Sequence, residues 1–75
     1  MFDDYLQILL RYMDIDAENI GPETRISDHC DLTGFAELLI EVEDTFAITI
    51  PSEITDQFPT VSQLWEYVKN RSDQA

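Results

Sequence analysis

Residues 31–51 read DLTGFAELLIEVEDTFAITIP, and their pattern sets the fold class of the chain. Apolar side chains fall within a narrow arc when residues 32–46 are placed at about 100° per residue, which predicts an amphipathic helix. Asp31 is a good N-cap, because its carboxylate can accept hydrogen bonds from the free N–H groups of the first turn. Pro51 closes the short alternating segment that follows, and a strand there would have no partner. The inward-facing side chains are Phe35, Leu38, Leu39, Val42 and Phe46.

Two further long helices are predicted on either side of this one. Residues 2–13 carry apolar side chains at helical spacing, and residues 60–70 do the same. Thr60 and Gln63 form a capping box at the start of the last helix, and residues 72–75 are expected to be a frayed tail. The apolar positions are Phe2, Leu6, Leu9, Leu10 and Met13 in the first helix and Val61, Leu64, Trp65 and Val68 in the last.

The remaining segments predict a long loop and one short helix. Residues 14–30 lose the helical period, and Gly21-Pro22 within them is typical of a turn. Ser52 can cap a brief helix over residues 53–57, which Pro59 ends. Without any strand signal, the expected fold is all-α: a four-helix bundle with a long loop between its first and second helices. The apolar anchors of that loop are Ile15, Ile20 and Ile26.

Length and charge exclude several classes of protein. The 75 residues leave room for a single domain, over residues 1–75, and 16 acidic against 4 basic residues give a net charge of −12. This charge disfavours binding to nucleic acid, which needs clustered Lys and Arg, and docking to anionic lipid. It favours a basic protein partner and, through self-repulsion, a monomer. The single cysteine and the absence of an apolar run of about 20 residues predict no disulfide, no membrane insertion and a cytoplasmic location.

The residues that could support catalysis or bind a metal form no recognised arrangement. His29 and Cys30 are chain neighbours, whereas the fold usually brings a nucleophile and its base together from distant positions. Asp14, Asp16 and Glu18 resemble the first ligands of a calcium loop, but Asn and Arg replace its later glycine and bidentate glutamate. We therefore expect no enzyme activity and no metal site, with Cys30 as a small buried hydrophobe.

The face of the central helix opposite the apolar arc carries one isoleucine among acidic residues. No Lys or Arg lies between Arg25 and Lys69, so the helix itself supplies no cation that neutralises this face. The pattern fits either a solvated acidic face that keeps a small protein soluble or a docking surface whose like-charge repulsion a basic partner relieves. The face consists of Thr33, Glu37, Ile40, Glu41 and Asp44.

Several of these segments together resemble the acyl carrier protein family. Residues 21–25 read GPETR, and Asp31 opens a helix. Residues 37–51 are similar to the Glu-Leu-x-x-x-(Leu/Ile)-Glu-x-x-Phe-x-Ile-x-(Ile/Val)-Pro pattern that ends the family's second helix. Residues 59–61, which read Pro-Thr-Val, match the start of its last helix. The resemblance covers residues 2–70.

The resemblance implies a fold, a prosthetic group and a set of partners. Gly34 with Glu37-Leu38-Leu39 is closest to the D-alanyl carrier branch. Family members carry acyl or aminoacyl groups as thioesters on a phosphopantetheine arm, which is attached to a serine at the start of the second helix. That acidic helix docks against basic patches on synthases, ligases and transferases. The partner-binding positions so implied are Thr33, Glu37, Ile40, Glu41, Glu43 and Asp44, and Leu32 adds apolar contact beside them.

Position 32 departs from the family pattern. The family has Asp-Ser-Leu where this chain reads Asp31-Leu32-Thr33, and a leucine has no hydroxyl that could form the phosphodiester. Three explanations are open. The chain is a carrier-like protein that lost the arm and kept a docking role, or it is a carrier that attaches the arm to Thr33. Otherwise it is a diverged or engineered member of the family, or one whose ligand binds non-covalently between the helices. We expect the first: a docking module of acyl or aminoacyl thioester metabolism without a cofactor. The alternative is a working carrier, attached through Thr33, in fatty-acid, polyketide, nonribosomal-peptide or cell-envelope biosynthesis.

Overall fold

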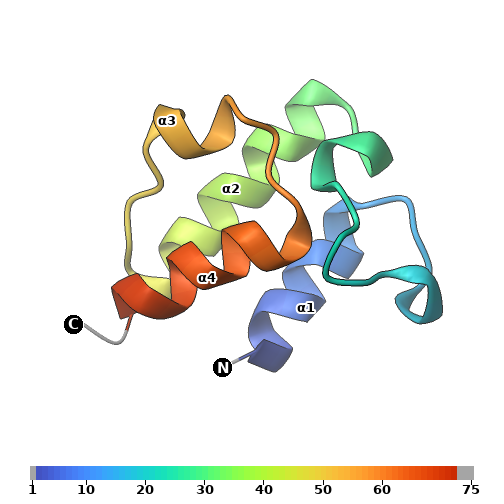
Figure 1. Cartoon of the computed structure of the whole chain (residues 1–75), viewed down its shortest axis with the longest axis horizontal. Helices are drawn as coiled ribbons and strands as arrows, with labels where there is room; N and C mark the ends of the chain where they lie inside the picture. Colours follow the sequence, from blue (N-terminus) through green and yellow to red (C-terminus); the bar gives the residue numbers. More distant parts are fainter. Residues whose placement is uncertain (1, 73–75) are drawn as a thin grey trace.

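Four α-helices and two short 3₁₀ helices form the computed structural model, which describes residues 2–72 (Figure 1). No strand occurs in this range, where Arg25 and Thr60 form an isolated backbone bridge. No helix in the same range is long and apolar enough to cross a membrane. The predicted all-α fold with four helices is confirmed. The elements are α1 (Phe2–Tyr12), η1 (Ala17–Asn19), η2 (Ile26–His29), α2 (Leu32–Phe46), α3 (Ser52–Thr55) and α4 (Val61–Ser72).

Side-chain caps set the starts of α2 and α4. α2 has the predicted range, and the Asp31 carboxylate accepts a hydrogen bond from the Gly34 N–H at 2.7 Å. The predicted capping box precedes α4: the Thr60 N–H donates to Gln63 Oε1 at 2.9 Å, and the Gln63 N–H donates to the Thr60 hydroxyl at 3.3 Å. Both caps satisfy N–H groups that have no partner within the helix.

The short helix α3 covers Ser52–Thr55 rather than the predicted residues 53–57. Pro51 is its N-cap, and the Ser52 side chain makes no capping hydrogen bond. Ser52 already lies in the first turn, because the first hydrogen bond of the helix runs from the Thr55 N–H to the carbonyl of Pro51 at 3.4 Å. The prediction that Ser52 is the N-cap is therefore wrong, because the N-cap precedes the first turn and Ser52 lies within it.

The last helix is longer than predicted. α4 continues to Ser72 instead of ending at residue 70, and the Ser72 hydroxyl donates to the Val68 carbonyl at 3.0 Å. The frayed tail predicted for residues 72–75 is thus wrong at its first residue, which this bond holds in the last turn. The rest of that prediction, residues 73–75, lies outside the described part of the chain.

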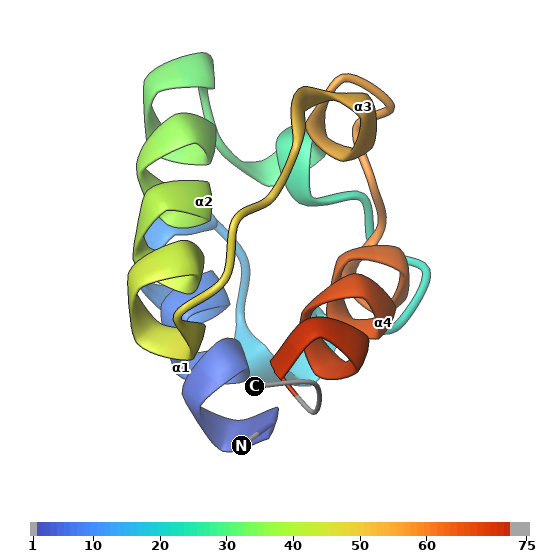
Figure 2. The same ribbon diagram turned by 90° about the vertical axis from the view of Figure 1, so that its left-hand side faces the viewer.

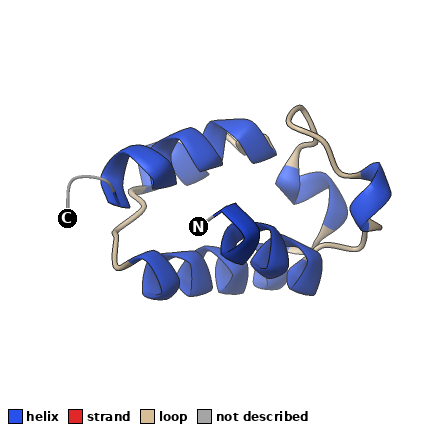
Figure 3. Ribbon diagram, turned by 90° about the horizontal axis from the view of Figure 1, so that it is seen from below, coloured by secondary structure: helices blue, strands red, loops and turns tan. Residues whose placement is uncertain are grey.

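The helices enclose one apolar core. α1 packs against α2, and Figure 2 shows α2 and α4 on opposite sides of the molecule, with α3 at one end. Figure 3 shows the same separation of α2 and α4 from below. The predicted inward face of α2 is confirmed, with three of its side chains buried and two packed against the core. The buried residues are Tyr5, Ile8, Leu9, Met13, Ile26, Phe35, Leu38, Val42, Ile50, Val61, Leu64 and Val68.

The long loop is held against this core by isoleucines and by backbone hydrogen bonds. Ile26 is completely buried, and Ile15 and Ile20 are half-buried against the core, as predicted. The start of α4 pairs with the loop, since the Val61 N–H donates to the Thr24 carbonyl at 2.8 Å. Two further backbone bonds join the same segments, from the Ser62 N–H to the Pro22 carbonyl at 3.0 Å and from the Ile26 N–H to the Pro59 carbonyl at 3.3 Å.

The buried face of α1 is shifted from the one that its periodicity predicts, although Leu9 and Met13 are buried as predicted. Tyr5 and Ile8 are buried, whereas the predicted core residues Phe2 and Leu6 stay partly exposed. The buried Tyr5 hydroxyl donates to the Val61 carbonyl at 2.7 Å, which gives the phenol the partner that burial requires. Burial also raises the pKa of Tyr5, so the hydroxyl keeps its proton and remains a donor. The apolar pattern predicted for this helix does not include Tyr5, and this contact places Tyr5 in the core.

Replacing Tyr5 by phenylalanine tests the α1–α4 contact. We expect Tyr5→Phe to lower the free energy of unfolding by about 1–2 kcal/mol, because it removes a buried hydrogen bond. Tyr67→Phe is the matched control, since that hydroxyl donates to the Thr49 carbonyl at 2.9 Å in an exposed position. Urea unfolding followed by circular dichroism measures both variants. Equal losses for the two would contradict a special role for Tyr5.

Candidate functional site

The N-terminal turn of α2 is the position to which the family resemblance assigns the prosthetic arm. Asp31 caps it through the hydrogen bond from the Gly34 N–H. Glycine at position 34 lets the Asp31 carboxylate come this close to the helix, since a Cβ there would lie 3.1 Å from Asp31 Oδ1. Leu32, the first helical residue, is 77% exposed, and Thr33 beside it is also exposed. A large aliphatic side chain with so little burial contributes little to the core, so its place at the surface is available for contact with another molecule.

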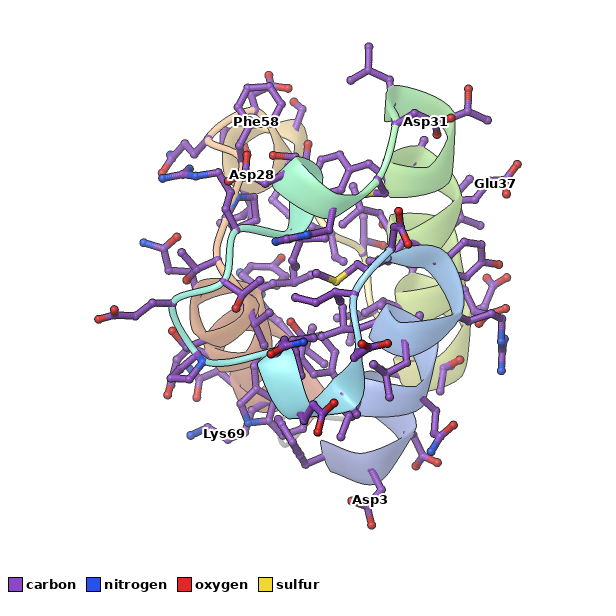
Figure 4. The ribbon with its side chains drawn as sticks, turned by 90° about the vertical axis from the view of Figure 1, so that its right-hand side faces the viewer. Asp3, Asp28, Asp31, Glu37, Phe58 and Lys69 are labelled. Carbon is purple, nitrogen blue, oxygen red and sulfur yellow. The ribbon has the colours of Figure 1, made fainter. Side chains whose placement is uncertain are left out.

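The outer face of α2 carries the predicted mixture of acidic and apolar side chains. Ile40 is 56% exposed, and Glu37, Asp44 and Thr33 are exposed along the same helix. Figure 4 shows Glu37 pointing away from the ribbon into solvent. Within residues 2–72, neither Glu37 nor Asp44 forms an ion pair. These two carboxylates therefore face solvent without a cation from the described part of the chain.

Glu41 differs from the other carboxylates of this face. It is half-buried and pairs with the Arg11 guanidinium of α1, and its other oxygen accepts a hydrogen bond from the Tyr12 hydroxyl at 3.3 Å. The helix itself supplies no cation, as the sequence indicates, but a neighbouring helix does. Because the Arg11 side chain is exposed, the pair is worth at most about 1 kcal/mol, and a cation from outside the chain can compete for Glu41.

Glu43 lies on the flank of the face and serves the fold. Its carboxylate accepts a hydrogen bond from the Ile50 N–H at 2.6 Å, and its carbonyl accepts one from the Ile48 N–H at 3.1 Å. Both bonds hold the connector that follows α2. The predicted partner-binding residues therefore fall into two groups: Leu32, Thr33, Glu37, Ile40 and Asp44 are exposed, whereas Glu41 and Glu43 are half-buried and bonded within the protein.

The basic side chains of the protein neutralise little of the negative charge on α2. All four of them are engaged within the protein, and Arg11 alone pairs with an acid of α2. Arg25 donates to the Phe58 carbonyl at 2.7 Å, and Lys69 pairs with a glutamate of its own helix. The Arg71 guanidinium lies 5.2 Å from the centre of the Tyr67 ring. The outer face of α2 is thus negatively charged, and it complements a basic surface.

A cleft of about 440 Å³ opens beside Leu32. Phe35 and Phe58 line it, with ring centres 6.4 Å apart, together with Cys30 and two aspartates. Phe58 has a φ of 51°, a left-handed conformation that is costly for residues with a side chain, and the residue is 44% exposed. Sequence reasoning missed Phe58, because a residue before proline is expected to be extended. In Figure 4, Phe58, Asp28 and Asp31 lie at the same end of the molecule.

Cys30 and His29 do not form a reactive pair. The Cys30 thiol donates to the Ile26 carbonyl at 3.4 Å, and the side chain is half-buried against the core. Burial, and then the Asp31 charge, raises the pKa of the thiol, which is the opposite of what activates a cysteine nucleophile. In the described part of the chain, no group of three or more His, Cys, Asp or Glu side chains is arranged to hold a metal ion.

Relatives with known names share most of the chain. No protein-family model matches the sequence. An acyl carrier protein of Chlorobium phaeovibrioides is 31% identical over 68 residues, which are 88% of this chain and 87% of that protein. An acyl carrier protein of a Picosynechococcus species is 32% identical over 65 residues, 84% of this chain and 80% of that protein. The acyl carrier protein of Chlorobium phaeobacteroides is 32% identical over 63 residues, 81% of each chain.

Two substitutions at Asp31 separate its role as a cap from its charge. We expect Asp31→Ala to lower the free energy of unfolding by about 1 kcal/mol, because the bond to the Gly34 N–H is lost. Asp31→Asn keeps an oxygen acceptor and removes only the charge, so its loss is expected to be roughly half as large or less. Urea unfolding measures both. A loss for Asp31→Asn as large as that for Asp31→Ala would show that charge, and not capping, dominates.

Proposed function

The chain belongs to the acyl carrier protein family, and from this premise we propose that it is a carrier-like docking module without a phosphopantetheine arm. Members of this family are carriers and not enzymes, which agrees with the expectation that the protein has no catalytic activity of its own. The proposed partners are enzymes of acyl or aminoacyl thioester metabolism that present a basic surface: a synthase, a ligase or a transferase. The proposed location is the cytoplasm.

The side chain at position 32 is the observation that carries this proposal. Leu32 is the first residue of α2 and is 77% exposed, so it stands where an attached group would reach solvent. It offers no oxygen for a phosphodiester, and the residues at this turn therefore do not fit covalent attachment in the usual way. Thr33 has an exposed hydroxyl one position further on, and a branched secondary alcohol is a poor substitute for the serine.

Docking through α2 follows from its charge and its exposed apolar residues. Glu37 and Asp44 are unpaired in the described part of the chain, and their field steers a basic surface toward the helix. Ile40 and Leu32 then supply apolar contact. Burying their apolar surface stabilises the complex by about 25 cal/mol per Å². Glu41 takes part only when a partner's cation displaces Arg11. Charge thus governs the rate of encounter, and apolar contact holds the complex.

The mass of the protein after incubation with coenzyme A and a permissive phosphopantetheinyl transferase tests the missing arm. We expect the natural chain to keep its mass, because position 32 has no nucleophile. Leu32→Ser restores a hydroxyl and is expected to gain one phosphopantetheine. Intact-mass spectrometry reads both results, and peptide mapping locates any adduct.

The same experiment decides between the proposed function and its alternative. An adduct on the natural chain, mapped to Thr33, would establish a working carrier and overturn the docking-only role. Thr33→Val is the control for that outcome, because it keeps the shape of the side chain and removes the hydroxyl. Circular dichroism of each variant checks that its helical content is unchanged.

A charge reversal on the Leu32→Ser chain tests the docking face. We expect Glu37→Lys to slow the transferase reaction by about tenfold at low salt and to weaken its dependence on salt, because it reverses an unpaired charge on the outer face. Glu53→Lys is the matched control, since Glu53 is exposed on α3 and lies outside this face. The initial rate of the mass gain is the measurement. Equal slowing by both variants would assign the effect to net charge and not to α2.

A further inference from the structure

An apolar groove lies between α1, the η1 segment and α4. Its volume is about 330 Å³, roughly twice that of an engineered cavity of about 150 Å³ that binds benzene. Phe2 and Leu6 of α1 form one wall, Val61 and Trp65 of α4 form the second, and Ile20 belongs to the loop that closes it. In Figure 4 the cyan η1 segment lies between α1 and α4, toward the end of the molecule that carries Asp3. The cleft that Asp31 and Phe58 line lies toward the opposite end, where these two residues are labelled.

Three of the residues that line the groove are assigned to the core by the helical pattern, but the fold leaves them partly exposed. Phe2, Leu6 and Trp65 occupy apolar positions of their helices, yet Phe2 is 44% exposed and the other two are partly exposed. Trp65 contacts Phe2 and Tyr5 at ring-centre distances of 5.0 Å each. An aromatic wall that is already ordered by such contacts loses little side-chain entropy when a ligand binds.

The charges around the groove select the kind of ligand. None of the lining residues is charged, and none is a Lys or Arg that could receive an anion. Asp3 and Glu18, which follow Phe2 and Ala17 in the sequence, are exposed acidic neighbours of the lining residues, whereas Glu66 after Trp65 pairs with Lys69. With a net charge of −12, the protein repels an anionic amphiphile and attracts a cationic one.

From this geometry we infer that the groove between α1 and α4 binds the apolar body of an organic cation, such as an alkylammonium or arylammonium ion. The alkyl or aryl part covers Phe2, Leu6 and Trp65, and the ammonium group stays in solvent, in the negative field of the protein. This site does not depend on the docking face of α2 or on the residue at position 32.

Trp65 is the single tryptophan of the chain, so its fluorescence reports on the groove directly. The probes are octylammonium and octanoate, which have the same chain length and opposite charges, both kept below the concentrations at which they form micelles. We expect a saturable change in Trp65 emission with octylammonium and about tenfold weaker binding of octanoate. Octanoate that binds as tightly as octylammonium would overturn the inferred charge preference, and the absence of any saturable change would overturn the site.

Groove-filling variants separate this site from attraction to the acidic surface as a whole. Ser62→Phe and Ala17→Leu each enlarge a side chain that lines the groove, and both are expected to weaken octylammonium binding by about tenfold. Ala36→Leu is the matched control, because Ala36 is exposed on α2 and does not line the groove. Circular dichroism identifies a variant that fails to fold. If one groove variant does not fold, octylammonium binding to the other groove variant tests the site. Unchanged binding by a folded groove variant would show that the cation binds elsewhere.

Discussion

The backbone of Val61 carries two hydrogen bonds that place α4 relative to the rest of the chain. Its N–H donates to the Thr24 carbonyl of the long loop at 2.8 Å, and its carbonyl accepts from the buried Tyr5 hydroxyl of α1 at 2.7 Å. One residue thus joins the first helix, the loop and the last helix. The rotation of α1 follows, because Tyr5 must face inward to reach this carbonyl. Phe2 and Leu6 lie at the edge of the core, where they line the groove beside Trp65.

α2 divides its acidic residues between the fold and the surface. Glu43 bonds to the connector and Glu41 pairs with Arg11, so both contribute to the protein's own structure. Glu37 and Asp44 remain exposed on the outer face, without an ion pair in the described part of the chain. The effective docking charge is therefore smaller than a count of carboxylates on the helix suggests. It is concentrated around Ile40, where apolar contact and charge can act together.

Local sequence signals were sufficient to predict the helices, whereas contacts between residues far apart in the sequence could not be predicted from them. The Asp31 cap and the Thr60–Gln63 capping box depend on residues three positions apart, so the sequence contains all of their geometry. The pair between Arg11 and Glu41 joins residues 30 positions apart, and nothing in the helical period of either segment indicates it. Phe58 was missed for a related reason: its left-handed backbone is held by the Arg25 guanidinium, 33 positions away.

The sequence by itself determined the fold class, the family resemblance and the lack of a serine at position 32. These depend on the period of apolar side chains, on capping residues and on the identity of Leu32, all of which are local properties. Only the tertiary structure decided which acidic residues stay free, how α1 is rotated and where an apolar groove stays open. Those outcomes depend on which distant groups satisfy buried polar atoms such as the Tyr5 hydroxyl, and the chain must be packed before such partners meet.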